Sequence, residues 1–180
     1  MTESDLFYTI GHSTHPLEEF VAMLKGASVT LVADVRTVPR SRTNPQYNAD
    51  TLPASLASFQ IGYAHIAALG GLRGRERDVP PGVNAFWQNA SFHNYADYAM
   101  GSDFRTGFAR LCELGRSQRC AIMCAEALWW RCHRRIIADY LLNAGARVLH
   151  LMGSRGVEPA HMTGAARRVA SGALSYPADS

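Results

Sequence analysis

Short apolar, β-branched runs alternate along the chain with segments of helical spacing. The continuous runs resemble strands that are buried on both faces of a sheet, and they cover residues 7–10, 29–33, 62–66, 120–124 and 147–151. Apolar residues three and four apart predict helices between them, at 16–26, 50–58, 94–100, 102–114 and 132–143. This alternation predicts an α/β fold: a single domain with a mostly parallel central sheet of about five strands and helices on both faces.

Three segments lack either pattern. Residues 34–45 form a polar loop, and residues 70–90 are rich in Gly, Pro, Arg and Asp, which predicts a long loop or lid. Residues 152–180 are expected to be a C-terminal tail of the same domain, with one or two helical turns at 163–170. At 180 residues the whole chain, 1–180, fits one domain.

Polar or glycine residues follow each predicted strand. Because the carboxyl ends of parallel strands meet at one sheet edge, and open α/β sheets bind ligands there, we expect one shared site. Its predicted members from the first three strand ends are Gly11, His12, Ser13, Asp34, Arg36, Ser41 and Arg73.

The fourth strand end brings the candidate chemistry. Cys124 ends a buried strand before a helix, where nearby Arg and His favour the nucleophilic thiolate. We therefore expect Cys124 to be the nucleophile, with Glu126 or His133 transferring protons. Cys132, His133 and Arg134 are predicted in the first helical turn, facing inward. The alternatives are a buried structural cysteine and a surface glutamate at a helix start.

Charge indicates the kind of ligand. The net charge is only +3, but Lys25 is the sole lysine among 18 basic residues. Arginine grips phosphates and carboxylates with two parallel hydrogen bonds, so Arg36, Arg73 and Arg134 are expected to bind a small anionic ligand or nucleic acid. Two hypotheses follow: an enzyme acting on a phosphate-bearing substrate, and a binding module that grips the same ligand without catalysis. A bias toward arginine codons would explain the composition equally well.

Other site types fit less well. We expect no cofactor; zinc bound by Cys124, Cys132 and His133 is an alternative, although seven residues separate the two cysteines where two to four are usual. A disulfide between Cys124 and Cys132 is a second alternative. Six residues lie between Cys124 and Arg131, one more than in cysteine-phosphatase loops, and Gly70–Gly74 lacks the dinucleotide and Walker patterns.

The remaining features concern location and partners. The N-terminus is polar and acidic, without a signal-peptide pattern, and no apolar run approaches the roughly 18 residues of a membrane span. We therefore expect a cytoplasmic protein with reduced thiols, no membrane contact, and no bar to forming a homo-oligomer. Trp129 and Trp130 could stack a base or belong to the core.

Together these motifs resemble the domain-of-unknown-function 488 (DUF488) family. The resemblance spans about residues 7–165 and is carried by Thr9–Ser13, Asp34–Arg36 with Pro39 and Ser41, Leu69–Arg73, Cys124–Glu126, Cys132–Arg134 and the tail Glu158–Thr163. It implies a small α/β domain with the same site residues and a biochemical role that is not settled. Ala127–Trp130 departs from the family, where this stretch is often more polar.

Overall fold

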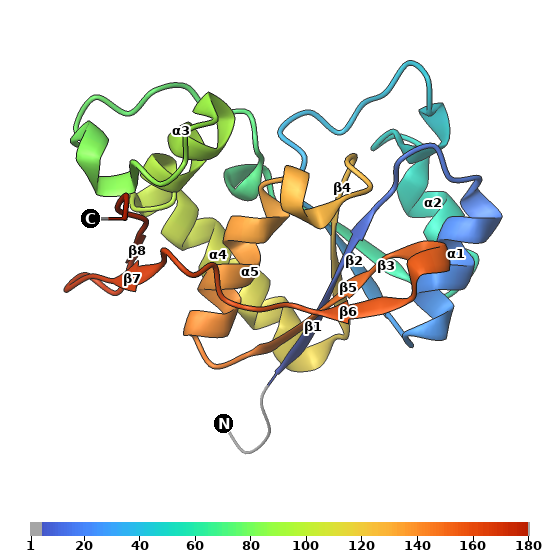
Figure 1. The fold of residues 1–180 in the computed structure, drawn as a ribbon. Helices are drawn as coiled ribbons and strands as arrows, with labels where there is room; N and C mark the ends of the chain where they lie inside the picture. The colour runs from blue at the N-terminus through green and yellow to red at the C-terminus, as the bar shows by residue number, and fades with distance from the viewer. Residues whose placement is uncertain (1–4, 180) are drawn as a thin grey trace.

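A six-stranded sheet forms the centre of the molecule in the computed structural model, which describes residues 5–179 (Figure 1). The strand order is β3-β2-β4-β1-β5-β6, and the first five strands are parallel. β6 pairs antiparallel with β5 and was not expected. The mostly parallel sheet is thus confirmed, with these strands: β1 (Leu6–Gly11), β2 (Leu31–Asp34), β3 (Gly62–His65), β4 (Cys120–Cys124), β5 (Arg147–Leu151) and β6 (Val157–Pro159).

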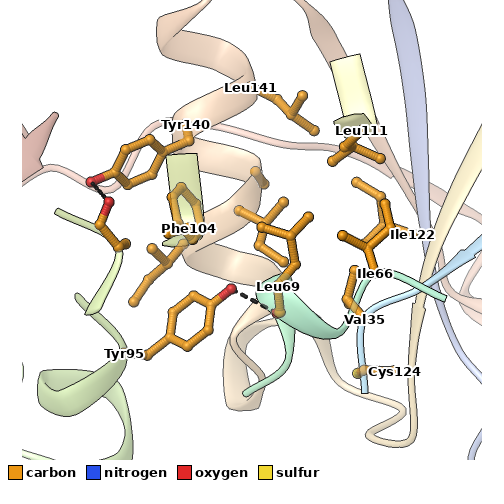
Figure 2. Packing of buried hydrophobic residues seen from close by; sticks show 14 of the residues in the cluster. Val35, Ile66, Leu69, Tyr95, Phe104, Leu111, Ile122, Cys124, Tyr140 and Leu141 are labelled. Atoms are coloured by element: carbon orange, nitrogen blue, oxygen red, sulfur yellow. Dashed lines mark hydrogen bonds between the residues drawn. The ribbon is translucent and has the colours of Figure 1, made fainter. Parts of the chain in front are cut away.

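Helices cover both faces of the sheet, as predicted. One face packs against α1 (Leu17–Gly26) and α2 (Leu52–Ala57), whose apolar side chains share a buried cluster with Ile10 and Val32. The other face packs against α3 (Ala90–Tyr98), α4 (Ser102–Ser117) and α5 (Arg134–Asn143). Figure 2 shows this second, larger cluster, with Cys124 at its margin.

Alternation along β4 determines which face each cysteine occupies. Ala121 and Met123 point into the α1–α2 cluster, whereas Cys120, Ile122 and Cys124 point into the α3–α5 cluster. Successive side chains of a strand point to opposite faces, so Cys124 must face α5.

Two boundaries differ from the predictions. α5 begins at Arg134, because His133 occupies the N-cap position; Cys132 and His133 therefore precede the helix instead of forming its first turn. α3 begins at Ala90, four residues earlier than expected, because the Asn89 side chain accepts hydrogen bonds from the backbone N–H groups of Ser91 and Phe92.

The tail contains no helical turn at 163–170, so that prediction was wrong. Instead β7 (Arg167–Arg168) pairs with β8 (Leu174–Ser175). Gly172 adopts φ 86° in the connection, a conformation that favours glycine. Leu174 and Tyr176 then pack into the α3–α5 cluster, which anchors the tail to the domain.

Short 3-10 turns fill several connections: η1 (Pro45–Tyr47), η2 (Ala67–Leu69), η3 (Pro81–Asn84), η4 (Trp129–Arg131) and η5 (Gly153–Arg155). The 70–90 segment is otherwise irregular, as expected for a loop. Within residues 5–179, none of the helices is both long enough and apolar enough to cross a membrane.

Candidate functional site

A pocket of about 640 Å³ opens at the carboxyl end of the parallel strands. Its walls come from the segments that follow β1, β2 and β4, from the residues just before α5, and from Gly71, Leu72, Ser91 and Phe92. Eight of the twelve predicted site residues line it: His12, Ser13, Arg36, Ser41, Cys124, Glu126, Cys132 and His133. The other four, Gly11, Asp34, Arg73 and Arg134, lie outside its wall.

Two cysteine sulfurs meet at the pocket wall. Cys124 Sγ and Cys132 Sγ lie 2.6 Å apart, and both residues are buried free thiols. Cys124 is the last residue of β4, whereas Cys132 directly follows η4. The loop between them folds back so that its two ends touch.

His133 is held in one orientation by the end of β2. Its Nε2 lies 2.7 Å from the carbonyl oxygen of Val35. Because a carbonyl only accepts hydrogen bonds, Nε2 carries a proton and donates. The other ring nitrogen, Nδ1, lies 3.4 Å from Cys132 Sγ. Cys132 thus contacts His133, and His133 is oriented by the Val35 carbonyl. A thiol, a histidine and a group that orients the histidine form the arrangement that activates thiol nucleophiles.

Arg134 lies beneath the two sulfurs and is fully buried. Its Nε donates to Cys124 Sγ at 3.0 Å. The two terminal nitrogens donate to Thr9 Oγ1 at 3.0 Å and to the carbonyl oxygen of Glu126 at 2.6 Å. The structure places Arg134 outside the pocket wall, with its guanidinium hydrogen-bonded to Cys124, Thr9 and Glu126; its role as an anion ligand stays a prediction.

These contacts shift the pKa values of the two thiols in opposite directions. Burial opposes ionisation of Cys132, but the hydrogen bond from Cys124 and the charges of His133 and Arg134 outweigh it, so the pKa of Cys132 falls well below its ordinary value. Burial and the hydrogen bond to Cys132 raise the pKa of Cys124. Burial alone would lower the pKa of His133, yet the neighbouring Cys132 thiolate raises it. The opposite directions make Cys132 the more acidic thiol of the pair.

Close packing explains two of the motif glycines. A Cβ on Gly71 would lie 2.5 Å from His133 Nδ1, so only glycine lets the imidazole occupy this place. A Cβ on Gly11 would collide with the carbonyl of Glu126. The loop after β4 is fixed there by hydrogen bonds from His12 N to Cys124 O and from Ser13 N to Ala125 O, at 2.9 and 3.0 Å.

Asp34 positions Arg36 instead of facing the pocket. The fully buried carboxylate accepts hydrogen bonds from Arg36 Nε at 2.9 Å and NH2 at 2.7 Å, and it also accepts one from the Tyr63 hydroxyl. Arg36 NH1 is left 3.3 Å from His12 Nε2. Burial lowers the pKa of His12, which leaves it a neutral acceptor for this guanidinium.

Arg73 and Trp129 are both held by contacts away from the pocket wall. Arg73 stacks its guanidinium 4.0 Å from the centre of the Tyr98 ring and donates to the carbonyls of Gly70 and Ala67, so it lies outside the pocket. Trp129 stacks on His150 with ring centres 4.5 Å apart, and its Nε1 donates to Glu158 Oε2 at 3.0 Å. Neither Trp129 nor Trp130 lines the pocket.

The pocket mouth has a cationic part and an apolar part. Arg40 and Arg131 line it with exposed side chains, and neither makes a side-chain hydrogen bond or ion pair within residues 5–179. The apolar part consists of Val38, Leu72 and Phe92, the first two being 61% and 76% exposed. Sequence reasoning did not predict Phe92 as a pocket residue. The signal that could have placed it is Asn89, a favourable N-cap residue that marks the start of α3.

Ser13 also has an unusual backbone at the pocket wall. Its φ of 46° lies in the left-handed region, which is rare for serine and often marks functional sites. For metals, the part of the chain that the structure describes holds no group of three or more His, Cys, Asp and Glu side chains arranged to bind an ion.

Comparison with known proteins places the chain in a family. The model described as "Domain of unknown function DUF488" matches residues 16–141, which include the motifs at Asp34, Gly71, Cys124 and Cys132. The Thr9–Ser13 motif and the tail motif lie outside that match. No curated protein and no solved structure matches the chain. Since the family model covers well over half of its residues, the chain belongs to the DUF488 family.

Proposed function

We propose that this protein is an enzyme in which Cys132 is the nucleophile toward an anionic substrate bound in the pocket. The single observation that carries the proposal is the position of Cys132 Sγ, 2.6 Å from Cys124 Sγ and 3.4 Å from His133 Nδ1. A thiolate needs nearby donors and positive charge to persist at neutral pH, and this sulfur has both. The nucleophile role expected for Cys124 thus passes to its neighbour.

The surrounding residues would stabilise the thiolate and transfer protons. His133, protonated beside the thiolate, can return its proton to a leaving group after attack. Cys124 Sγ lies against Cys132 Sγ, and Arg134 donates to Cys124 Sγ, so that its positive charge lies beside the sulfur pair. Glu126 faces the pocket with an exposed carboxylate whose Oε1 accepts from Leu128 N at 3.2 Å, and it is the second candidate for proton transfer.

The pocket mouth supports a substrate with two different ends. Arg40 and Arg131 suit a phosphate or carboxylate group. Across the opening, Val38, Leu72 and Phe92 suit a flat or apolar group. A nucleotide, free or within a nucleic acid, satisfies both requirements.

The test is the pH dependence of Cys132 alkylation by iodoacetamide, followed by peptide mass spectrometry. Trypsin cleaves after Arg131 and after Arg134, so Cys132 is read in the peptide 132–134. We expect a thiol pKa well below the usual ~8.5. Cys112 is an internal reference, because burial raises its pKa. An ordinary pKa at Cys132 would contradict the proposal and favour a binding module without catalysis.

A further inference from the structure

We infer that Cys124 and Cys132 form a reversible disulfide that removes the nucleophile, making this sulfur pair a site of oxidative modification. The inference rests on the proposed function for the identity of the sulfur that reacts first. The pairing itself rests on geometry alone.

The two sulfurs are already in place for a bond. They lie 2.6 Å apart as free thiols, and a disulfide needs about 2.05 Å, a movement of roughly half an ångström. Both ends of the connecting loop are fixed: Cys124 O accepts from His12 N at 2.9 Å, and Cys132 Sγ accepts from Arg134 N at 3.4 Å. Closure therefore requires no rearrangement of the sheet or of α5.

The other two cysteines do not share this arrangement. Cys120 begins β4 and is fully buried, and Cys112 lies on α4. Among residues 5–179, neither has a sulfur partner within hydrogen-bonding distance. Burial raises the pKa of Cys120 to about 12 and also raises that of Cys112, which keeps both as unreactive thiols.

The reaction consumes one hydroperoxide and two thiols. Cys132 thiolate attacks the hydroxyl oxygen of the hydroperoxide and the O–O bond breaks. The other oxygen leaves as hydroxide from hydrogen peroxide, or as alkoxide from an organic hydroperoxide, and takes up a proton to become water or an alcohol. The product at Cys132 is a sulfenic acid. Cys124 then loses its proton and its sulfur attacks Cys132 Sγ, so that the S–O bond breaks and a second hydroxide leaves as water. Two electrons pass from the thiols to the peroxide, and a dithiol reductant returns them.

Oxidation in this way has two consequences for the pocket. The thiolate disappears, so the proposed nucleophile is switched off until the disulfide is reduced. The bond also removes the sulfenic acid before a second peroxide can convert it to the irreversible sulfinic acid. Cys124 would thus protect Cys132 as a resolving cysteine.

The experiment is a peptide map after brief treatment with hydrogen peroxide and blocking of the remaining thiols. Without reduction, trypsin releases 120–131 and 132–134 as separate peptides unless a disulfide joins them. We expect the joined pair in the wild type and in the controls Cys112→Ser and Cys120→Ala, and its loss after dithiothreitol. In Cys124→Ala we expect no joined pair, and Cys132 should proceed to sulfinic acid.

The outcomes separate the two proposals. Wild-type protein that gives separate peptides, with Cys132 oxidised to sulfinic acid as fast as in Cys124→Ala, would overturn the disulfide. If Cys132 nevertheless alkylates with a depressed pKa, the nucleophile stands. A joined peptide pair together with an ordinary Cys132 pKa would keep the disulfide and overturn the nucleophile. The wild-type map needs no variant, so a folding defect in Cys124→Ala leaves the test intact.

Discussion

His133 donates through Nε2 to the carbonyl oxygen of Val35, the first residue after β2, at 2.7 Å. This hydrogen bond to a backbone carbonyl fixes the orientation of the imidazole ring. In many thiol enzymes an Asn or Asp side chain has that role. The hydrogen bond to Val35 also determines which ring nitrogen faces Cys132. The geometry of the proposed nucleophile therefore depends on a strand that lies two positions away from β1 in the sheet.

Replacing His133 should weaken the thiolate. In His133→Ala the charge that helps to lower the pKa of Cys132 is lost. The pKa of Cys132 should therefore rise, and alkylation should slow by about tenfold for each unit by which this pKa exceeds the pH of the assay. Alkylation rates read from the peptide 132–134 measure the effect. His161→Ala, in the exposed tail, is the matched control. Equal rates in the two variants would show that His133 does not activate Cys132.

Two glycines of one loop should respond differently to alanine. Gly71→Ala places a methyl group 2.5 Å from His133 Nδ1, whereas a Cβ at Gly74 has no neighbour within 4 Å. Gly71→Ala should lower stability by about 1–3 kcal/mol, as overpacking does, and slow alkylation of Cys132. Gly74→Ala should leave both unchanged. Urea unfolding and the alkylation rate test the pair, and a reactive thiol in Gly71→Ala would mean that the imidazole has room to move.

The two exposed arginines of the pocket mouth should bind anions. We expect inorganic pyrophosphate to bind the wild type with an affinity that falls as salt is added. The double variant Arg40→Gln and Arg131→Gln should bind at least about tenfold more weakly, a loss of about 1.4 kcal/mol. Isothermal titration calorimetry measures it, and Arg110→Gln, on the exposed surface of α4, is the control. Unchanged affinity in the double variant would place the anion elsewhere.

His150 should make the protein less stable in acid. Burial, with a further contribution from Arg134, lowers its pKa to about 4, against about 6.5 in an unfolded chain. Between these values the unfolded chain binds a proton that the folded protein does not. The free energy of unfolding should therefore fall as pH decreases through this window, by up to about 1.4 kcal/mol per pH unit.

Urea unfolding at about pH 7 and about pH 5 measures this slope. His150→Asn keeps a side-chain acceptor available for Thr9, which lies 2.6 Å from His150 Nδ1, and it should reduce the slope. His161→Asn should not. A slope equal to that of the wild type in His150→Asn would assign the acid sensitivity to other groups.

The sheet edge that carries the site could be predicted from sequence because it depends on local pattern. The apolar run 120–124 corresponds to β4 at both ends, and its last residue is Cys124. Parallel pairing then brings the carboxyl ends of β1, β2 and β4 to one edge of the sheet, independently of the directions of their side chains. This is why most of the predicted residues line one pocket.

Side-chain direction could not be predicted in the same way. Arg73 turns to the Tyr98 ring, a contact 25 positions along the chain, and Arg134 turns under the sulfurs to Thr9. Both choices depend on which long-range partner lies within reach of a flexible side chain. Which of two adjacent thiols ionises is likewise decided by distances of a few ångströms to His133 and Arg134.

The strand order has a consequence for how the chain folds during synthesis. β4 lies between β2 and β1, so Tyr8 has no sheet neighbour until Ala121 and Leu149 have been made. Pairings this distant in sequence form slowly and late. The first half of a nascent chain can fold β2 with β3, but it leaves β1 without a partner strand and exposes its unpaired edge to chaperones. Cys132 gains its full surroundings only after β1, β2 and β4 have come together, because Val35 after β2 holds His133 and Thr9 of β1 holds Arg134.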